Sequence, residues 1–428
     1  MVQTRLIDLL NLIDETIENE EYPRGLQLIL SNWYDLPDPS PLRERTALLL
    51  ATVGRKREAV EVYSLAARHY ANSGFPTRAL AAIKQMQNLN PSSTQLLDHF
   101  TTLYSVRSPF LERDRTQTDF PHPSGKLRLD VENDGDLDEL FEKALDRATD
   151  TEGTAERPGA LPALPLLSIL PPKALRRLLD FLEYEIFAES QPVVNSDKNH
   201  ADLLWAVSSD LLVTEVDKTV RVPAGALLGL SAFGQDTGAP KYSVVSQKGS
   251  ECLRLNHRSV EALSEEFPDF PNRLATLRRH ALTEGLFVRH PMFAELDLQA
   301  LERLPSRLVG LKIDPGTICV RQGKTSPGLY IILDGKVDIV RTDDDWEITL
   351  ETLGPGDMMG EVGLVTPRPA LATAITTRAC HALFFARHDF MAFADHFPSI
   401  ATYAEAQAKR RVTSLEDTIS ATDLAEVD

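Results

Sequence analysis

The sequence predicts an α+β multidomain protein, with an α-helical domain first and two small β-roll (jelly-roll) domains after it. Three observations carry this prediction. Apolar residues recur at helical spacing through residues 1–105. Short β-rich runs alternate with glycine turns in residues 287–412. A weaker copy of that second pattern fills residues 162–286, which makes two domains of one kind in tandem.

The helical pattern of residues 1–105 is interrupted by Gly54, Gly74 and Pro91. An alanine stands five residues after each of these glycines, and a bulkier residue follows four positions later: Ala59 with Tyr63, and Ala79 with Ile83. This arrangement resembles the tetratricopeptide repeat, whose period of thirty-four residues is longer than the spacing of twenty found here. The resemblance implies stacked helical hairpins with a groove for a peptide or protein partner. A plain helical bundle is the alternative.

Residues 106–161 have the composition of an acidic, flexible linker. From Asp130 to Arg157 there are eleven acidic residues against three basic ones, a balance that disfavours independent folding. The exception is segment 136–148, whose apolar residues share one helical face and whose first residue, Asp136, is a good N-cap. This amphipathic helix is expected either to dock on another domain or a partner protein, or to have no role.

Residues 287–412 carry the most specific pattern in the chain. A glycine-rich loop, Leu353 to Leu364, lies between short β-rich runs and could cradle a phosphate. It belongs to a series of motifs: Pro291-Met292-Phe293, Gly316, Gln322-Gly323, Tyr330 to Val337, Leu353 to Asp357 and Gly360 to Leu364. On these residues the segment resembles the cyclic-nucleotide-binding domain family. The resemblance implies a β-roll with a pocket for a cyclic nucleotide.

The same resemblance implies which residues would line the pocket. In the family a glutamate binds the ribose 2′-hydroxyl and an arginine pairs with the cyclic phosphate. Glu361 matches that glutamate, whereas Ala370 stands where the arginine is expected. Arg368 lies two positions early between two prolines, which hold it extended and away from the pocket. The candidate pocket residues are Gly360, Glu361, Val362, Gly363, Leu364, Arg368, Ala370 and Thr373.

The missing arginine decides what we expect of the pocket. A charge-assisted contact to phosphate contributes about 2 to 5 kcal/mol, so its loss weakens binding by tens to thousands of fold. A cyclic nucleotide is therefore the only cofactor that the sequence implies, and its binding is expected to be weakened or lost. Alternatively, the Gly360-Glu361 pair only closes the turn of the barrel, with Glu361 bonded to a backbone amide.

The earlier copy, residues 162–286, has lost more of the motif. Leu230 stands in the place of the ribose glutamate, and Lys241 is the cation nearest to the lost arginine. We expect a domain that keeps the fold without the ligand chemistry. Helices within 260–287 join the two domains, and residues 413–428 form a polar tail.

Composition and missing motifs exclude several classes of function. The net charge is −18 with a pI near 5.1, so neither nucleic acid nor an anionic membrane is an expected partner. No signal peptide or transmembrane run is present, which makes a cytoplasmic location the expectation. Histidines and cysteines are scattered without metal-site spacing, and catalytic motifs are absent. The sequence therefore predicts a protein that is not an enzyme.

Three hypotheses remain for its role. The first is an adaptor that binds protein partners through residues 1–105, and through segment 136–148, with the barrels as scaffold. The second is a signalling regulator gated by a cyclic nucleotide in the second barrel, and the third is a component of a larger, oligomeric assembly. Ala370 replaces the phosphate-binding arginine of the second barrel, and Leu230 replaces the ribose-binding glutamate of the first. The sequence therefore favours the adaptor.

Overall fold

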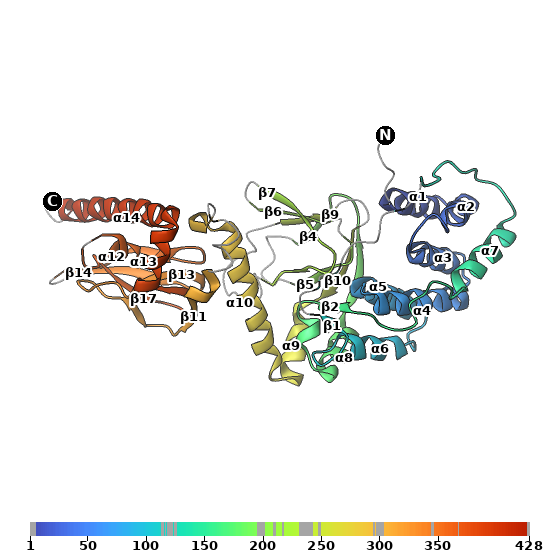
Figure 1. Cartoon of the computed structure of the whole chain (residues 1–428), viewed down its shortest axis with the longest axis horizontal. Helices are drawn as coiled ribbons and strands as arrows, with labels where there is room; N and C mark the ends of the chain where they lie inside the picture. The colour runs from blue at the N-terminus through green and yellow to red at the C-terminus, as the bar shows by residue number, and fades with distance from the viewer. Residues whose placement is uncertain are drawn as a thin grey trace. The chain divides into compact units, whose positions relative to one another are not determined.

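The structure is a computed structural model that describes residues 6–112, 115, 117, 123, 126–194, 202–208, 211–215, 218–230, 243–246, 250–293, 296, 304–343, 346–366 and 368–425. The chain forms two compact units, Met1–Leu277 and Arg278–Asp428 (Figure 1). The division falls within one helix, α10 (Phe270–Arg289), in which the expected boundary between 286 and 287 also lies.

The first unit opens with a stack of helices. They are α1 (Leu6–Glu18), α2 (Tyr22–Asn32), α3 (Ser40–Thr52), α4 (Lys56–Ser73), α5 (Pro76–Leu89) and α6 (Gln95–Tyr104). Gly74 ends α4 at φ 88°, a conformation that glycine adopts without strain. Ala59 and Ala79 are fully buried, and α4 packs on α5. The resemblance to tetratricopeptide repeats stays a prediction, because these helices do not identify the repeat.

The first β-roll, residues 183–255, completes this unit. Its strands are β3 (Glu183–Phe187), β4 (Pro192–Val194), β5 (Leu203–Ala206), β6 (Leu211–Glu215), β7 (Lys218–Val222), β8 (Leu227–Leu228), β9 (Ser243–Ser246) and β10 (Ser250–Leu255). They pair antiparallel in two sheets, ordered β3-β10-β5-β8 and β4-β9-β6-β7. Helix α8 (Pro172–Phe181) precedes the roll and α9 (His257–Glu266) follows it.

The second β-roll, residues 308–386, has the same topology. Its strands are β11 (Leu308–Ile313), β12 (Ile318–Val320), β13 (Gly328–Asp334), β14 (Val337–Asp343), β15 (Trp346–Leu353), β16 (Met358–Met359), β17 (Thr373–Thr376) and β18 (Cys380–Ala386). The sheets run β11-β18-β13-β16 and β12-β17-β14-β15, which matches the first roll strand for strand. Two β-rolls of one topology therefore follow each other along the chain.

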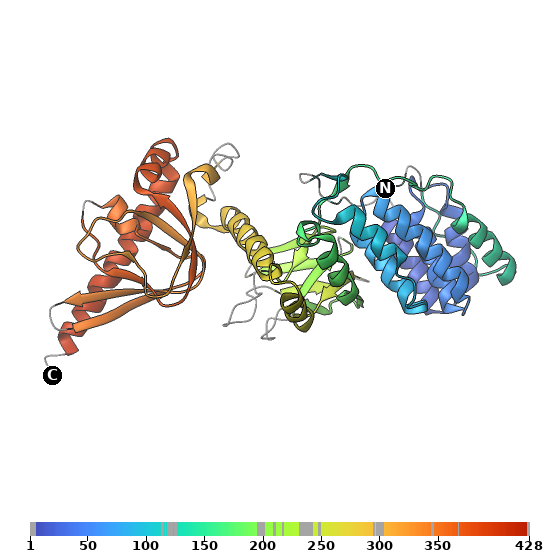
Figure 2. The same cartoon turned by 90° about the horizontal axis from the view of Figure 1, so that it is seen from below.

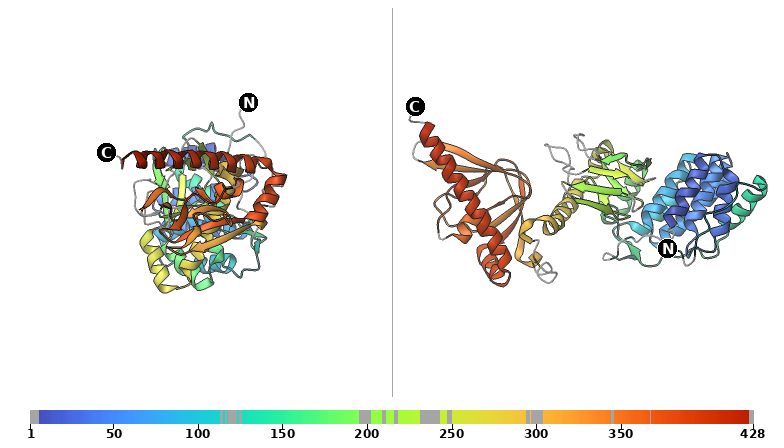
Figure 3. Two further views of the ribbon diagram at one scale, coloured as in Figure 1. Left: turned by 90° about the vertical axis from the view of Figure 1, so that its left-hand side faces the viewer. Right: turned by 90° about the horizontal axis from the view of Figure 1, so that it is seen from above.

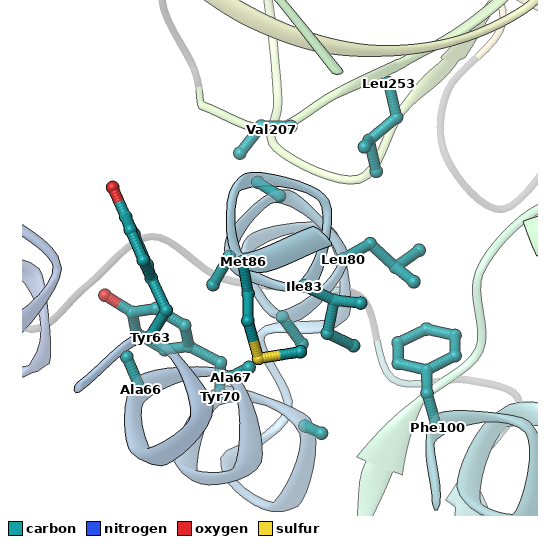
Figure 4. Packing of buried hydrophobic residues seen from close by; sticks show 14 of the residues in the cluster. Tyr63, Ala66, Ala67, Tyr70, Leu80, Ile83, Met86, Phe100, Val207 and Leu253 are labelled. Carbon is teal, nitrogen blue, oxygen red and sulfur yellow. The ribbon is translucent and has the colours of Figure 1, made fainter. Parts of the chain in front are cut away.

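The helices of the first unit share a hydrophobic core with the first β-roll. Figure 4 shows Val207 and Leu253 of the roll over Leu80 of α5. An ion pair lies in the same interface, because Arg78 of α5 bonds to Glu251 of β10. Burial alone would raise the pKa of Glu251, but Arg78 and Arg45 lower it below the usual carboxyl value. The sheet that contains β10 therefore packs on the helices of the first unit.

The acidic segment is also part of this unit. Strands β1 (Leu111–Glu112) and β2 (Leu161–Pro162) pair in parallel, and helix α7 (Leu137–Thr149) between them packs on α2, α3 and α4. Asp136 caps α7, as predicted, by accepting a hydrogen bond of 2.9 Å from the amide of Glu139.

Helices also complete the second unit. They are α12 (Glu361–Val365), α13 (Arg387–His396) and α14 (Pro398–Ala425). Where the sequence predicts a polar tail from residue 413, α14 continues through Ala425. It lies alongside the strands of the second β-roll (Figure 3).

Candidate functional site

The predicted binding loop, Leu353 to Leu364, runs from the end of β15 through β16 into α12 of the second β-roll. Gly360 has φ 90°, and a side chain there would meet the carbonyl oxygen of Gly328 at 2.3 Å from its Cβ. Only glycine fits this close approach. Gly363 is equally tight, since a Cβ would lie 2.9 Å from the Cβ of Ser326. These two glycines let α12 approach β13 and so carry Glu361 into the interior of the roll.

Glu361 is buried, with 1% of its surface exposed, and its partner is an arginine from α14. Arg411 Nη1 donates to Glu361 Oε1 at 2.5 Å and to the carbonyl of Met358 at 2.7 Å. Arg411 Nε donates to Glu351 Oε2 at 3.1 Å. Besides Arg411, the carboxylate accepts a hydrogen bond from the backbone amide of Glu361 itself, the kind of pairing that the sequence suggested. The cation comes from a helix fifty residues further along the chain.

The second oxygen of Glu361 stands out electrostatically. Glu361 Oε2 is buried and has no hydrogen-bond partner among the described residues. Burial raises the pKa of Glu361 above the usual value, and Arg411 opposes this rise without cancelling it. Burial alone would lower the pKa of Arg411. The carboxylates of Glu361 and Glu351 outweigh this effect and raise the pKa above that of an ordinary arginine. The loop thus keeps one buried acceptor available to a donor.

The position expected to supply a cation beside that acceptor holds Ala370. This residue is 8% exposed and packs in the hydrophobic core of the roll. Its backbone pairs with the 323–324 turn, since Ala370 N donates to the carbonyl of Lys324 and the amide of Gly323 donates to the carbonyl of Ala370. Arg368 is exposed, and its expected orientation away from the pocket stays a prediction. The described residues therefore suit a sugar hydroxyl near Glu361 and do not suit a cyclic phosphate near Ala370.

The remaining predicted residues serve the backbone of the loop. Leu364 is buried in the core between α12 and α14, and Val362 accepts the amide hydrogen bond that ends α12. Thr373 begins β17, where its hydroxyl oxygen accepts a hydrogen bond of 3.1 Å from the amide of Gln322. They shape the loop and add no charge to it.

Arg411 is the residue that sequence reasoning missed. In the sequence it belongs to Lys409-Arg410-Arg411, the only basic cluster near the end of the chain. By itself, such a cluster bears only on whether the protein could bind nucleic acid. The useful signal was spacing: Ile400, Ala404, Ala408 and Arg411 lie on one face of a helix. The first three are at most 1% exposed, so this face packs on the roll and carries Arg411 to Glu361.

The first β-roll places different residues at the same point. Gly229 follows β8 as Gly360 follows β16, with φ 87°, and a Cβ there would lie 2.1 Å from the carbonyl oxygen of Asp202. The next residue, Leu230, is 5% exposed and packs in the core. The tight turn is therefore kept while the carboxylate is absent. Lys241 lies outside the described residues.

Neither a metal site nor a membrane-spanning helix is found in the part of the chain that the structure describes. Within it, no three His, Cys, Asp or Glu side chains are grouped so as to hold a metal ion. Nor does any described helix combine the length and the apolar character needed to cross a bilayer.

Comparison with known proteins agrees with the geometry of the second β-roll. Residues 311–397 match the family model described as cyclic nucleotide-binding domain. The cAMP-dependent protein kinase type II regulatory subunit of Drosophila melanogaster is 32% identical over 103 residues, which are 24% of this chain and 27% of that protein. The cyclic AMP receptor protein of Thermus thermophilus is 33% identical over 92 residues, 21% of this chain and 43% of that protein. The chain thus spans less than half the length of either relative.

Solved structures give similar matches. The regulatory subunit of a cAMP-independent protein kinase A from Trypanosoma brucei overlays 57% of this chain and 87% of its own, with 18% identity and a TM-score of 0.28. The catabolite activator protein of Thermus thermophilus overlays 31% of this chain and 63% of its own, with 26% identity and a TM-score of 0.28. By these sequence matches, residues 311–397 of this chain are similar to the cyclic nucleotide-binding domain of protein kinase A regulatory subunits.

Proposed function

We propose that the chain is a non-enzymatic regulatory adaptor. Its first unit binds a protein partner, with the first β-roll as a scaffold for the helices. Its second unit is a cyclic nucleotide-binding fold in which an internal ion pair has taken the place of nucleotide binding. The regulatory class of the proposed function is taken from relatives with this domain, such as those named above.

One observation carries the proposal: the carboxylate expected to bind ribose is neutralised by the protein's own Arg411. The guanidinium makes three contacts there, to Glu361, Glu351 and the carbonyl of Met358. A ribose hydroxyl that binds through Glu361 Oε1 would have to displace the Nη1 contact, at a cost, and the phosphate would find no cation at Ala370 in return. Both effects oppose binding of a cyclic nucleotide.

The first unit supports the scaffold part of the proposal. The loop after β8 carries Leu230 in place of a carboxylate, and the β3-β10 edge of one sheet is packed against α5. The buried pair of Arg78 and Glu251 ties that sheet to the helices. Removing either partner of such a pair costs about 3 to 5 kcal/mol, so helices and roll are expected to act as one body.

Calorimetric titration of the full chain with cyclic AMP and cyclic GMP tests the proposal. We expect the natural chain to bind more weakly than about 1 mM. Ala370→Arg restores the missing cation and should tighten binding by at least about 30-fold, which corresponds to about 2 kcal/mol. Arg368→Ala is the matched control, because Arg368 is exposed and should contribute nothing. Micromolar binding by the natural chain that Arg368→Ala abolishes would refute the proposal.

A ligand-gated regulator is the second candidate, and the unpartnered oxygen of Glu361 favours it. A ligand with a hydroxyl donor could satisfy Glu361 Oε2 and compete with Arg411 for the carboxylate. Such competition makes a clear prediction, since Arg411→Gln should then increase affinity and Glu361→Gln should abolish it. If both variants leave all titrations flat, the adaptor without a ligand is favoured.

A further inference from the structure

Segment 113–160 connects two strands of the first unit that pair side by side. It starts after β1 and ends before β2, and these strands pair with each other, Leu111 with Leu161 and Glu112 with Pro162. Between them, residues 126–150 follow the outer side of α2, α3 and α4 (Figure 2). Because its two ends are held together, this segment can leave the helices without separating the rest of the unit.

The first part of the segment is held through its backbone. Asn32, at the end of α2, is fully buried. Its Nδ2 donates to the carbonyl of Arg128 at 2.9 Å, and its Oδ1 accepts from the amide of the same residue at 2.7 Å. Beside this pair, Leu127 is 4% exposed in the shared core. A side-chain amide that pairs with both backbone groups of one residue holds an extended peptide whatever its sequence.

The second part is held as a helix. Phe141, Ala144 and Ala148 of α7 are buried against the stack, with at most 3% of their surface exposed. Arg43 of α3, itself 2% exposed, donates from Nε to the carbonyl of Ala148 at 2.8 Å and from Nη2 to the carbonyl of Asp150 at 2.9 Å. Carbonyls at the end of a helix lack partners within the helix. Arg43 therefore recognises a helix that ends at this point.

The polar side chains of the helices that contact this segment favour acidic groups in whatever binds there. Arg55, the N-cap residue of α4, pairs with Glu142 at 2.8 Å and lies over the ring of Phe141, with 5.7 Å from Cζ to the ring centroid. Gln27 of α2 donates to the side chain of Asp134 at 2.6 Å. Arg43 adds a further buried cation, whose donors meet the carbonyls of Ala148 and Asp150 at the end of the helix. The surface favours an acidic occupant.

We infer that α2, α3 and α4 form a peptide-binding groove that residues 127–150 fill in the resting chain. Its partner is an acidic peptide that begins extended at Asn32 and continues as an amphipathic helix ending at Arg43. The buried face of that helix carries an aromatic residue followed by small residues three and seven positions later, as Phe141, Ala144 and Ala148 are in the cis occupant. The inference rests on the proposed adaptor function and assigns the adaptor's partner site.

Fluorescence anisotropy with a labelled peptide of residues 126–151 tests the groove. The receptor is the full chain with residues 127–150 replaced by a glycine-serine linker of equal length. We expect saturable binding at about 10 μM. In the intact chain the tethered segment competes at an effective concentration of about 1 mM, so the same peptide should bind about 100-fold more weakly. This experiment does not involve the second β-roll, so its failure leaves the nucleotide titrations unaffected.

Matched peptides define specificity. Phe141→Ala in the peptide should weaken binding at least 10-fold, whereas Lys143→Ala, at an exposed position, should leave it unchanged. Should the linker variant fail to fold, Phe141→Asp in the full chain releases α7 by a single change and serves as receptor instead. A folded receptor that ignores the peptide, equal binding of both chains, or a dimer that exchanges residues 127–150 between two copies would each overturn the inference.

Discussion

Replacing Arg411 with glutamine gives the sharpest test of the second unit. The change removes the guanidinium that neutralises Glu361, which is 1% exposed, and leaves a side chain of similar length on α14. It also removes the bonds to Met358 and Glu351. We expect the end of α12 and the adjoining turns of α14 to open more often.

The size of the effect follows from the protonation of Glu361. Losing one partner of a buried ion pair costs about 3 to 5 kcal/mol if the other stays charged. Glu361 can instead take up a proton. Since its pKa in an unfolded chain is 4.5, at pH 7 that costs at most 2.5 units at 1.36 kcal/mol each, or about 3 kcal/mol. The cost should therefore shrink steadily as the pH falls from 7 towards 4.5.

Hydrogen exchange measured by mass spectrometry on the full chain is the appropriate assay. Peptides covering 353–366 and 398–413 should exchange faster in Arg411→Gln at pH 7, by up to about 300-fold, and less so at pH 5. Arg410→Gln is the control, since it removes the same charge from an exposed neighbouring position. Glu361→Gln combined with Arg411→Gln should recover most of the protection. Equal effects of the two arginine changes, or an effect independent of pH, would refute the reasoning.

Two further predictions concern glycine and a buried amine. Gly360→Ala should destabilise the second unit by at least about 2 kcal/mol more than Gly356→Ala in urea unfolding, because both have φ near 90° but only residue 360 has an atom within 4 Å of the new Cβ. Burial lowers the pKa of Lys84 to about 8 from 10.5, so the unfolded chain binds the proton more tightly and the stability of the first unit should rise between pH 8 and 10.5. Lys84→Met should raise the free energy of unfolding at pH 7 by about 1 to 3 kcal/mol and abolish that rise; a stability that falls over this range would contradict the assignment.

The sequence predicts the architecture of the second β-roll well because its glycines are fixed by geometry. Gly360 and Gly335 both have positive φ, and a Cβ at either position would lie within 2.5 Å of a backbone carbonyl oxygen, so their spacing reports the fold directly. The first roll has fewer such constraints, yet Gly229 marks the same turn. Backbone requirements of this kind are local, which is why they can be read along the chain.

Contacts between residues far apart in the sequence could not be predicted in this way. Arg411 and Glu361 are fifty residues apart, and Asn32 and Arg128 are ninety-six apart. The charge pattern predicts that residues 130–157 are too acidic to fold alone, and this stays a prediction about the isolated segment. It does not indicate that Arg43 and Arg55 lie where that segment returns to the helices. Only the tertiary fold brings these groups together.

Under the two proposals made above, two recognition surfaces of the chain are filled by its own groups, one in each unit. Arg411 neutralises the ribose-type carboxylate in the second β-roll, and residues 127–150 cover the helices of the first unit. An occupant tethered to its receptor competes at about millimolar concentration, so only a partner with micromolar affinity or better displaces it. Internal occupants therefore set an affinity threshold without changing the fold. For this reason, release variants such as Arg411→Gln and Phe141→Asp are expected to be better baits than the natural chain.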